Sequence, residues 1–220
     1  MITKNKILTF LFSTCVAFSS AQNSKLTLDL DGTSTNIKIQ PTMYGIFFED
    51  INFAADGGIY AELIKNRSFE FDEPLTGWKQ PNTKQLSQNF DSGFLTIYTD
   101  DSKTNKNYAR ITVQNDKNYL LENEGFRGIG LHQNSGYDFS FDLENASGNI
   151  SAVNASLIDE KGAVISTVPI LIKGKGWQKY TAVFSPSRTV EKAKLQITFT
   201  GNGVANMDMI SLFPQDTWKG

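Results

Sequence analysis

The stretch YDFSFDLE, residues 137–144, indicates the fold class because apolar and polar side chains alternate along it. Tyr137, Phe139, Phe141 and Leu143 fall on one side of an extended chain, and the residues between them fall on the other. One covered face and one solvated face are typical of a strand in an antiparallel sheet. The stretch therefore predicts a half-buried β-strand.

The same alternation recurs outward from this stretch in both directions, with turn residues between the segments. The clearest segments are FLTIYTD (94–100), YARITVQ (108–114), VNASLID (153–159), AVISTVPILI (163–172), QKYTAVFS (178–185), AKLQITFT (193–200) and MDMISLF (207–213). Strands at this cadence, without a long helix between them, predict a mainly β fold, an antiparallel β-sandwich or jelly roll over residues 72–214. We expect DEKG (159–162) and TGNG (200–203) to form hairpin turns.

The composition of the chain bears on its binding partners, and its first residues bear on its location. The chain has 220 residues, 20% of them charged, and a formal net charge of -2, so we expect neither nucleic acid nor an anionic membrane as a partner. Residues 1–21 join a basic start to an apolar run too short to span a bilayer, and end in small residues. They predict a signal peptide cleaved near Ala21 and a secreted or periplasmic protein. The one cysteine, Cys15, lies within this segment, which leaves no thiol for disulfides.

The pattern of apolar residues changes at residue 43. Residues 43–48 are continuously apolar, as in a strand covered on both faces of a parallel sheet, and the run ends at Glu49 and Asp50. Carboxylates at the carboxyl end of such a strand are typical of (β/α)8 barrel enzymes, whose pockets lie at that end. Apolar residues at helical spacing predict a short helix within residues 58–65, and alternation within residues 22–42 predicts a strand pair.

Residues 44–71 carry a resemblance to a known family. YGIFFEDINFAADGGIYAELIKNRSFEF is similar to the N-terminal region of glycoside hydrolase family 51, the α-L-arabinofuranosidases. The matching positions are Gly45, Phe47, Glu49, Asp50, Gly57, Gly58, Tyr60, Glu62, Asn66, Arg67 and Phe69. The resemblance implies an accessory β-sandwich for residues 22–42, the first strand of an incomplete barrel with its loop for 43–71, an inserted module for 72–214, and a stub toward the barrel for 215–220.

The resemblance also implies an activity. Family members release terminal α-L-arabinofuranosyl residues from plant polysaccharides such as arabinan and arabinoxylan with retention, and Glu49 matches the glutamate that binds the arabinofuranose hydroxyls. The acid/base and nucleophile belong to later barrel strands, so we assign no catalytic residue to this chain and expect it to be inactive alone. The residues by themselves leave another role for Glu49 open, a strand-end carboxylate bound by Arg67 or a backbone amide. The alternative for the whole chain is a free-standing secreted carbohydrate-binding module.

The inserted module has a resemblance of its own. NRSFEFDEPLTGW (66–78) and ANMDMISLF (205–213) are similar to the opening and closing segments of carbohydrate-binding modules with the galactose-binding jelly-roll fold. This implies Glu70 and Asp208 as ligands of a structural calcium, although Met209 departs from the usual second acid; ordinary strand-end charges are the other interpretation. Trp78 and Trp177 are candidate platforms for a sugar, or packing residues. We expect catalysis to need no cofactor, and the sequence does not indicate an oligomeric state.

Overall fold

The computed structural model describes residues 25–29, 38, 40–47, 49, 55–81 and 91–217. The chain divides into two compact units, Met1–Phe47 and Phe48–Gly220. The predicted signal peptide, with its cleavage point at Ala21, lies outside the described residues. No described helix is long and apolar enough to cross a membrane.

The described part of the first unit holds a single helical turn and no strand. The turn is η3 (Pro41–Met43), which begins at a proline whose fixed φ suits a first helical position. Residues 25–29, within the predicted strand pair, have exposed side chains and no ladder partner. Residues 44–47, within the predicted barrel strand, are also exposed and unpaired. An isolated strand or hairpin without a covered face is marginal in water, so a barrel or accessory sheet at these positions stays a prediction.

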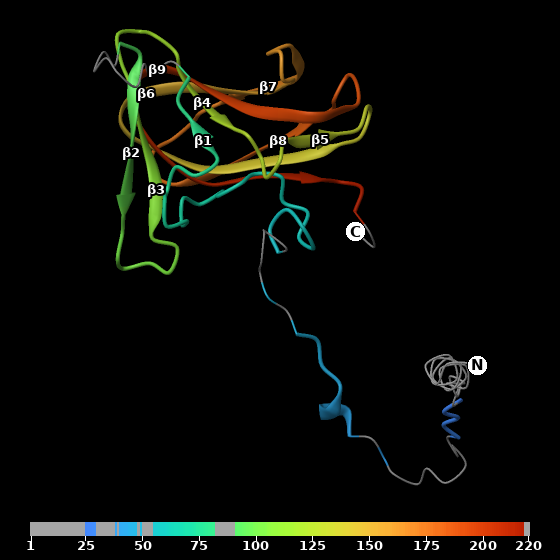
Figure 1. The fold of residues 1–220 in the computed structure, drawn as a ribbon. Helices are drawn as coiled ribbons and strands as arrows, with labels where there is room; N and C mark the ends of the chain where they lie inside the picture. The colour runs from blue at the N-terminus through green and yellow to red at the C-terminus, as the bar shows by residue number, and fades with distance from the viewer. Residues whose placement is uncertain are drawn as a thin grey trace, which may run out of the picture. The chain divides into compact units, whose positions relative to one another are not determined.

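The second unit is built from antiparallel strands. They are β1 (Trp78–Lys79), β2 (Gly93–Thr99), β3 (Asn107–Val113), β4 (Tyr119–Asn123), β5 (Ile129–Leu131), β6 (Tyr137–Ile158), β7 (Val164–Leu171), β8 (Gln178–Phe184) and β9 (Val190–Pro214). Figure 1 shows the long strands β6 and β9 crossing the whole body of the unit. Every predicted alternating segment overlaps one of these strands, and β1, β4 and β5 are short strands that the alternation did not reveal.

One continuous sheet folds over on itself to make two layers. The first half of β6 pairs with β8 and the second half with β7, while β9 pairs with β4 through its first half and with β3 through its second. The layers therefore run β2-β3-β9-β6-β8 and β1-β4-β9-β6-β7, with β5 beside β9. This confirms the predicted mainly β jelly-roll sandwich. The apolar faces of both layers meet in one core.

The two long strands bend where they pass between layers. The register of β6 against β9 shifts near Asn145 and again near Ile150, and glycines of both strands lie at this bend. The hairpin predicted at residues 200–203 is wrong, because β9 continues through them while glycine lets the two backbones approach closely. The hairpin predicted at 159–162 is confirmed, because a turn there joins β6 to β7. The N–H of Asp159 donates to the carbonyl of Ala163 across this turn at 2.9 Å.

Gly201 should tolerate no side chain. Its φ of +137° is disfavoured for other residues, and a Cβ there would collide with the carbonyl oxygen of Asn149. We expect Gly201→Ala to lower the free energy of unfolding by about 2 kcal/mol, measured by urea denaturation. Gly162→Ala is the matched control, because its φ is also positive, at +82°, but its Cβ would meet nothing within 4 Å. A loss at Gly162 equal to that at Gly201 would contradict the steric explanation.

Residues before β1 also belong to the sandwich. Ile64 and Phe69 are fully buried in its core. The helix predicted within residues 58–65 is wrong, since turns and bends occupy the segment and Leu63 donates its N–H to the carbonyl of Leu212 in β9 at 3.0 Å. Bonding to the sheet has replaced the bonds within a helix.

Candidate functional site

Aromatic side chains gather on the outer face of the β2-β3-β9-β6 layer. Because side chains alternate along β3, Ala109 and Ile111 point into the core while Tyr108 and Arg110 point outward. Tyr98 of β2 lies directly across from Tyr108, with their ring centroids 5.9 Å apart. Trp177, just before β8, meets Tyr108 edge-on at 5.6 Å and 85°. The three rings form a line across the layer, which we call the aromatic row.

Arg110 is fixed within this row. Its guanidinium carbon lies 3.8 Å from the ring centroid of Tyr98. Its Nε donates to Oδ1 of Asn206 at 2.8 Å, and Nδ2 of Asn206 donates to Oε2 of Glu144 at 2.8 Å. Strands β3, β9 and β6 each supply one member of this chain, so the sheet register sets its geometry. We call Arg110, Asn206 and Glu144 the polar row.

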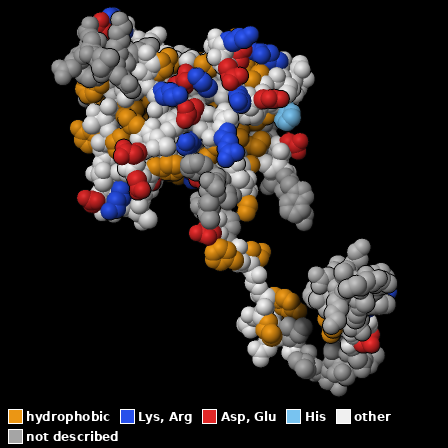
Figure 2. Space-filling view, in the orientation of Figure 1, with side chains coloured by type: hydrophobic (Ala, Val, Ile, Leu, Met, Phe, Trp, Pro, Cys, Tyr) orange, Lys and Arg blue, Asp and Glu red, His pale blue; other side chains and the backbone are white. Residues whose placement is uncertain are grey.

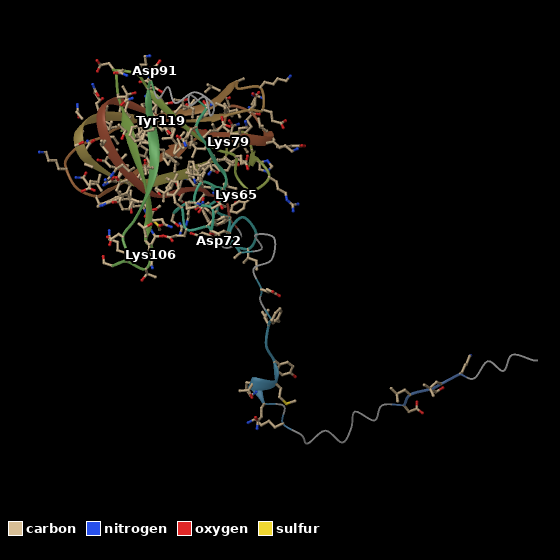
Figure 3. All side chains as sticks on the ribbon, turned by 60° about the vertical axis from the view of Figure 1, so that its left-hand side comes forward. Lys65, Asp72, Lys79, Asp91, Lys106 and Tyr119 are labelled. Atoms are coloured by element: carbon tan, nitrogen blue, oxygen red, sulfur yellow. The ribbon has the colours of Figure 1, made fainter. Side chains whose placement is uncertain are left out.

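A pocket of ≈ 330 Å³ opens beside the aromatic row. Trp177 and Tyr108 line it together with the β2–β3 turn, Asp142 of β6 and Asp208 of β9. Figure 3 labels Lys106 of that turn at one end of the sandwich and Asp91 at the other, so the pocket lies at the Lys106 end. A concave site that combines aromatic walls with a few polar groups is the usual form of a small-ligand site.

Asp208 forms part of the pocket lining and is only 9% exposed. Its Oδ2 accepts from Nδ2 of Asn105 at 2.6 Å, and its Oδ1 accepts from the N–H of Met209 at 2.7 Å. Burial raises the pKa of Asp208 to about 6; the two hydrogen bonds oppose this rise, and the carboxylates of Asp142 and Glu70 add to it. The φ of Met209 is +52°, at the bulge where β6 and β9 change register.

The predicted calcium ligands Glu70 and Asp208 both accept hydrogen bonds from neighbouring groups. Glu70 accepts from the N–H of Asn107 at 2.7 Å and from its Nδ2 at 3.2 Å. Each carboxylate oxygen of Glu70 and Asp208 thus faces a hydrogen-bond donor, whereas calcium needs six to eight oxygens facing it. Among the residues that the structure describes, no group of three or more His, Cys, Asp or Glu side chains is placed to hold a metal. Calcium binding stays a prediction.

The two predicted sugar platforms, Trp78 and Trp177, differ in how far their side chains are exposed. Trp78 is 6% exposed, its ring centroid lies 5.4 Å from that of Phe69, and its Nε1 donates to the carbonyl of Asn66 at 2.9 Å. The prediction of a sugar platform at Trp78 is therefore wrong, since a side chain that is only 6% exposed offers no open ring face to a sugar. Trp177 is 39% exposed and lines the pocket. Its neighbours Tyr98, Tyr108 and Arg110 were not among the predicted site residues, although the alternation along two strands places them on one face.

Comparisons with known proteins find similarity to α-L-arabinofuranosidases. An extracellular exo-α-L-arabinofuranosidase of Streptomyces chartreusis is 36% identical over 200 residues, 87% of this chain and 22% of the relative. α-L-Arabinofuranosidase 2 of Arabidopsis thaliana is 28% identical over 96% of this chain and 32% of its own length. The arabinose-bound structure of a family 51 α-L-arabinofuranosidase superposes with a TM-score of 0.66 and 25% identity, over 80% of this chain and 30% of the other. This chain is a relative of the family 51 α-L-arabinofuranosidases. No protein-family model matches the sequence.

Two glutamates, Glu49 and Glu62, lie in the segment that resembles the arabinofuranosidases. Glu49, the predicted sugar ligand, is exposed, and its substrate-binding role stays a prediction. Glu62 is 0% exposed, and its carboxylate accepts from the N–H groups of Leu63, Ile64 and Leu212 and from the hydroxyl of Ser211, at 2.7–3.0 Å. Nη1 of Arg67 lies 3.9 Å from this carboxylate. In this arabinofuranosidase relative, Glu62 ties the segment before β1 to β9.

Proposed function

We propose that this chain is the N-terminal part of an exported, retaining α-L-arabinofuranosidase that releases terminal α-L-arabinofuranosyl residues from arabinan or arabinoxylan. This proposal rests mainly on the 36% identity to the Streptomyces arabinofuranosidase over 87% of this chain. The chain spans 22% of that relative and 32% of the Arabidopsis one, so the activity belongs to a longer protein in this proposal. The extracellular relative also supports the predicted export.

Residue roles follow from the same proposal. Glu49 accepts hydrogen bonds from the arabinofuranose hydroxyls, while the acid/base and nucleophile lie outside these residues. The alternative, a free-standing carbohydrate-binding module, needs the apolar segment 43–48 to be covered by the sandwich.

Glu49 offers the test of this proposal. In the protein extended through its barrel, Glu49→Gln should lower kcat/KM on an aryl α-L-arabinofuranoside by about 10- to 100-fold, because a hydrogen bond from sugar to a charged group is worth about 1.5–3 kcal/mol. Proton NMR of the first product should show the retained anomer.

The matched control is Asp56→Asn, which removes an exposed carboxylate a few residues further along the chain. It should leave kcat/KM unchanged. An inverted product, or unchanged kinetics in Glu49→Gln, would contradict the proposal.

A further inference from the structure

We propose that the aromatic row and the pocket beside it form a binding surface for the pyranose backbone of a neutral polysaccharide. The inference goes beyond hydrolysis and does not depend on it. Its first support is Trp177, whose indole is 39% exposed at the pocket. Tyr108 meets this ring edge-on at 5.6 Å, and Nζ of Lys103 lies 6.0 Å from its centroid. An anchored aromatic ring exposes a flat apolar surface at little cost in side-chain entropy, which suits stacking against a ligand.

The charges at the pocket indicate a neutral ligand. Lys103 lies 3.4 Å from Asp100, and Lys106 lies 3.2 Å from Asp101, so both cations of the turn have acidic partners. On the other wall Asp208 accepts hydrogen bonds from Asn105 and Met209. Figure 2 shows acidic and basic side chains intermingled over the visible face of the sandwich. The pocket therefore has no electrostatic field of one sign that would attract a phosphorylated chain or a chain of uronic acids.

Polar groups along the same face can recognise hydroxyls. The guanidinium of Arg110 carries five N–H groups, of which Nε bonds Asn206 and Nη2 lies 3.4 Å from the hydroxyl of Tyr108. The remaining N–H groups and the second oxygen of Glu144 offer donors and an acceptor beside the rings. Because Asn206 is 3% exposed and holds both partners, these groups are fixed before a ligand arrives. Tyr108 belongs to both the row and the pocket wall, so the surface extends past a single sugar unit.

Ring shape separates backbone sugars from arabinose side chains. A pyranose chair offers a broad face of C–H groups that can cover an indole, whereas a puckered furanose offers a smaller and less even face. Apolar contact area sets the stacking energy, so the aromatic row should prefer pyranose chains. In this proposal the sandwich binds the main chain of a polysaccharide such as xylan rather than its arabinofuranosyl branches.

Isothermal titration calorimetry on the 220-residue chain tests the proposal without any catalytic step. Xylohexaose and cellohexaose are the pyranose probes, and linear arabinohexaose is the furanose probe. We expect at least one pyranose chain to bind more tightly than arabinohexaose, and Trp177→Ala to weaken that binding by about tenfold. Trp177→Phe should fall between the two, because it keeps a smaller ring. Tyr60→Ala is the control, since Tyr60 is 46% exposed and packs on Phe213 away from the pocket.

Three results would overturn the proposal: binding of neither pyranose chain, arabinohexaose bound as tightly as the pyranose chains, or unchanged binding in Trp177→Ala. A thermal melt of each variant checks folding, and Trp177→Phe keeps the test valid should the alanine variant unfold. Because binding is measured on the chain alone, its failure leaves the arabinofuranosidase proposal standing, and failure of the activity test leaves the binding result standing.

Discussion

The 220-residue chain alone is expected to leave an aryl α-L-arabinofuranoside uncleaved, whereas the longer protein that we propose, extended through a barrel, should cleave it. Retention requires two carboxyl groups about 5–5.5 Å apart, one as nucleophile and one as acid/base. The buried carboxylates of the described residues already have structural partners. Glu62 accepts from several backbone N–H groups, Glu122 from Lys194 and Gln196, and Asp208 from Asn105 and Met209. Carboxylates held in this way fit packing roles better than catalysis.

The measurement is release of the aryl leaving group by equal molar amounts of the two purified proteins. A cooperative thermal melt of the short chain is the control, because it separates an incomplete active site from a misfolded sample. Turnover by the short chain that persists through purification would refute the assignment of the catalytic pair to residues beyond it. Equal inactivity of the extended protein would instead count against the family activity.

Alternation along the strands made the sandwich predictable, but contacts between distant segments were not. The period of two revealed most strands, because each has one face in the core and one in water. It could not show that YDFSFDLE and VNASLID are halves of a single strand, since the bend near Gly148 reads locally like a turn. The strand β1 has only two residues, too few for any period to appear.

The candidate site was predictable only in part for the same reason. A tryptophan in a GW context reads alike in a core and at a rim, yet Trp78 is buried and Trp177 is half-exposed. What separates them is tertiary: the carbonyl of Asn66 accepts the indole N–H of Trp78. The polar row depends on the register of β3 against β9 and of β9 against β6, which the sequence does not state.

Glu62→Ala is expected to lower the free energy of unfolding by about 3–5 kcal/mol, the largest effect on stability that we predict. The side chain is 0% exposed, and its Oε1 accepts from the N–H groups of Leu63, Ile64 and Leu212 at 2.9–3.0 Å. Truncation removes the acceptor of the buried N–H groups of Ile64 and Leu212, at about 1–3 kcal/mol for each group that water cannot reach. The N–H of Leu63 keeps the carbonyl of Leu212 as a second acceptor. It also leaves Arg67 without its carboxylate partner at 3.9 Å. Urea denaturation followed by circular dichroism gives the difference.

Two further variants separate the hydrogen bonds of Glu62 from its charge. Glu62→Gln keeps a carbonyl oxygen of similar position but loses the negative charge, so its loss should be smaller, about 1–2 kcal/mol. Glu191→Ala, the control, removes an exposed carboxylate from β9 and should change stability by less than about 0.5 kcal/mol. Equal losses in Glu62→Gln and Glu62→Ala would assign the effect to charge alone. A loss in Glu62→Ala no greater than in Glu191→Ala would mean that the segment before β1 is held to β9 by the apolar contacts of Ile64 and Phe69 rather than by this carboxylate.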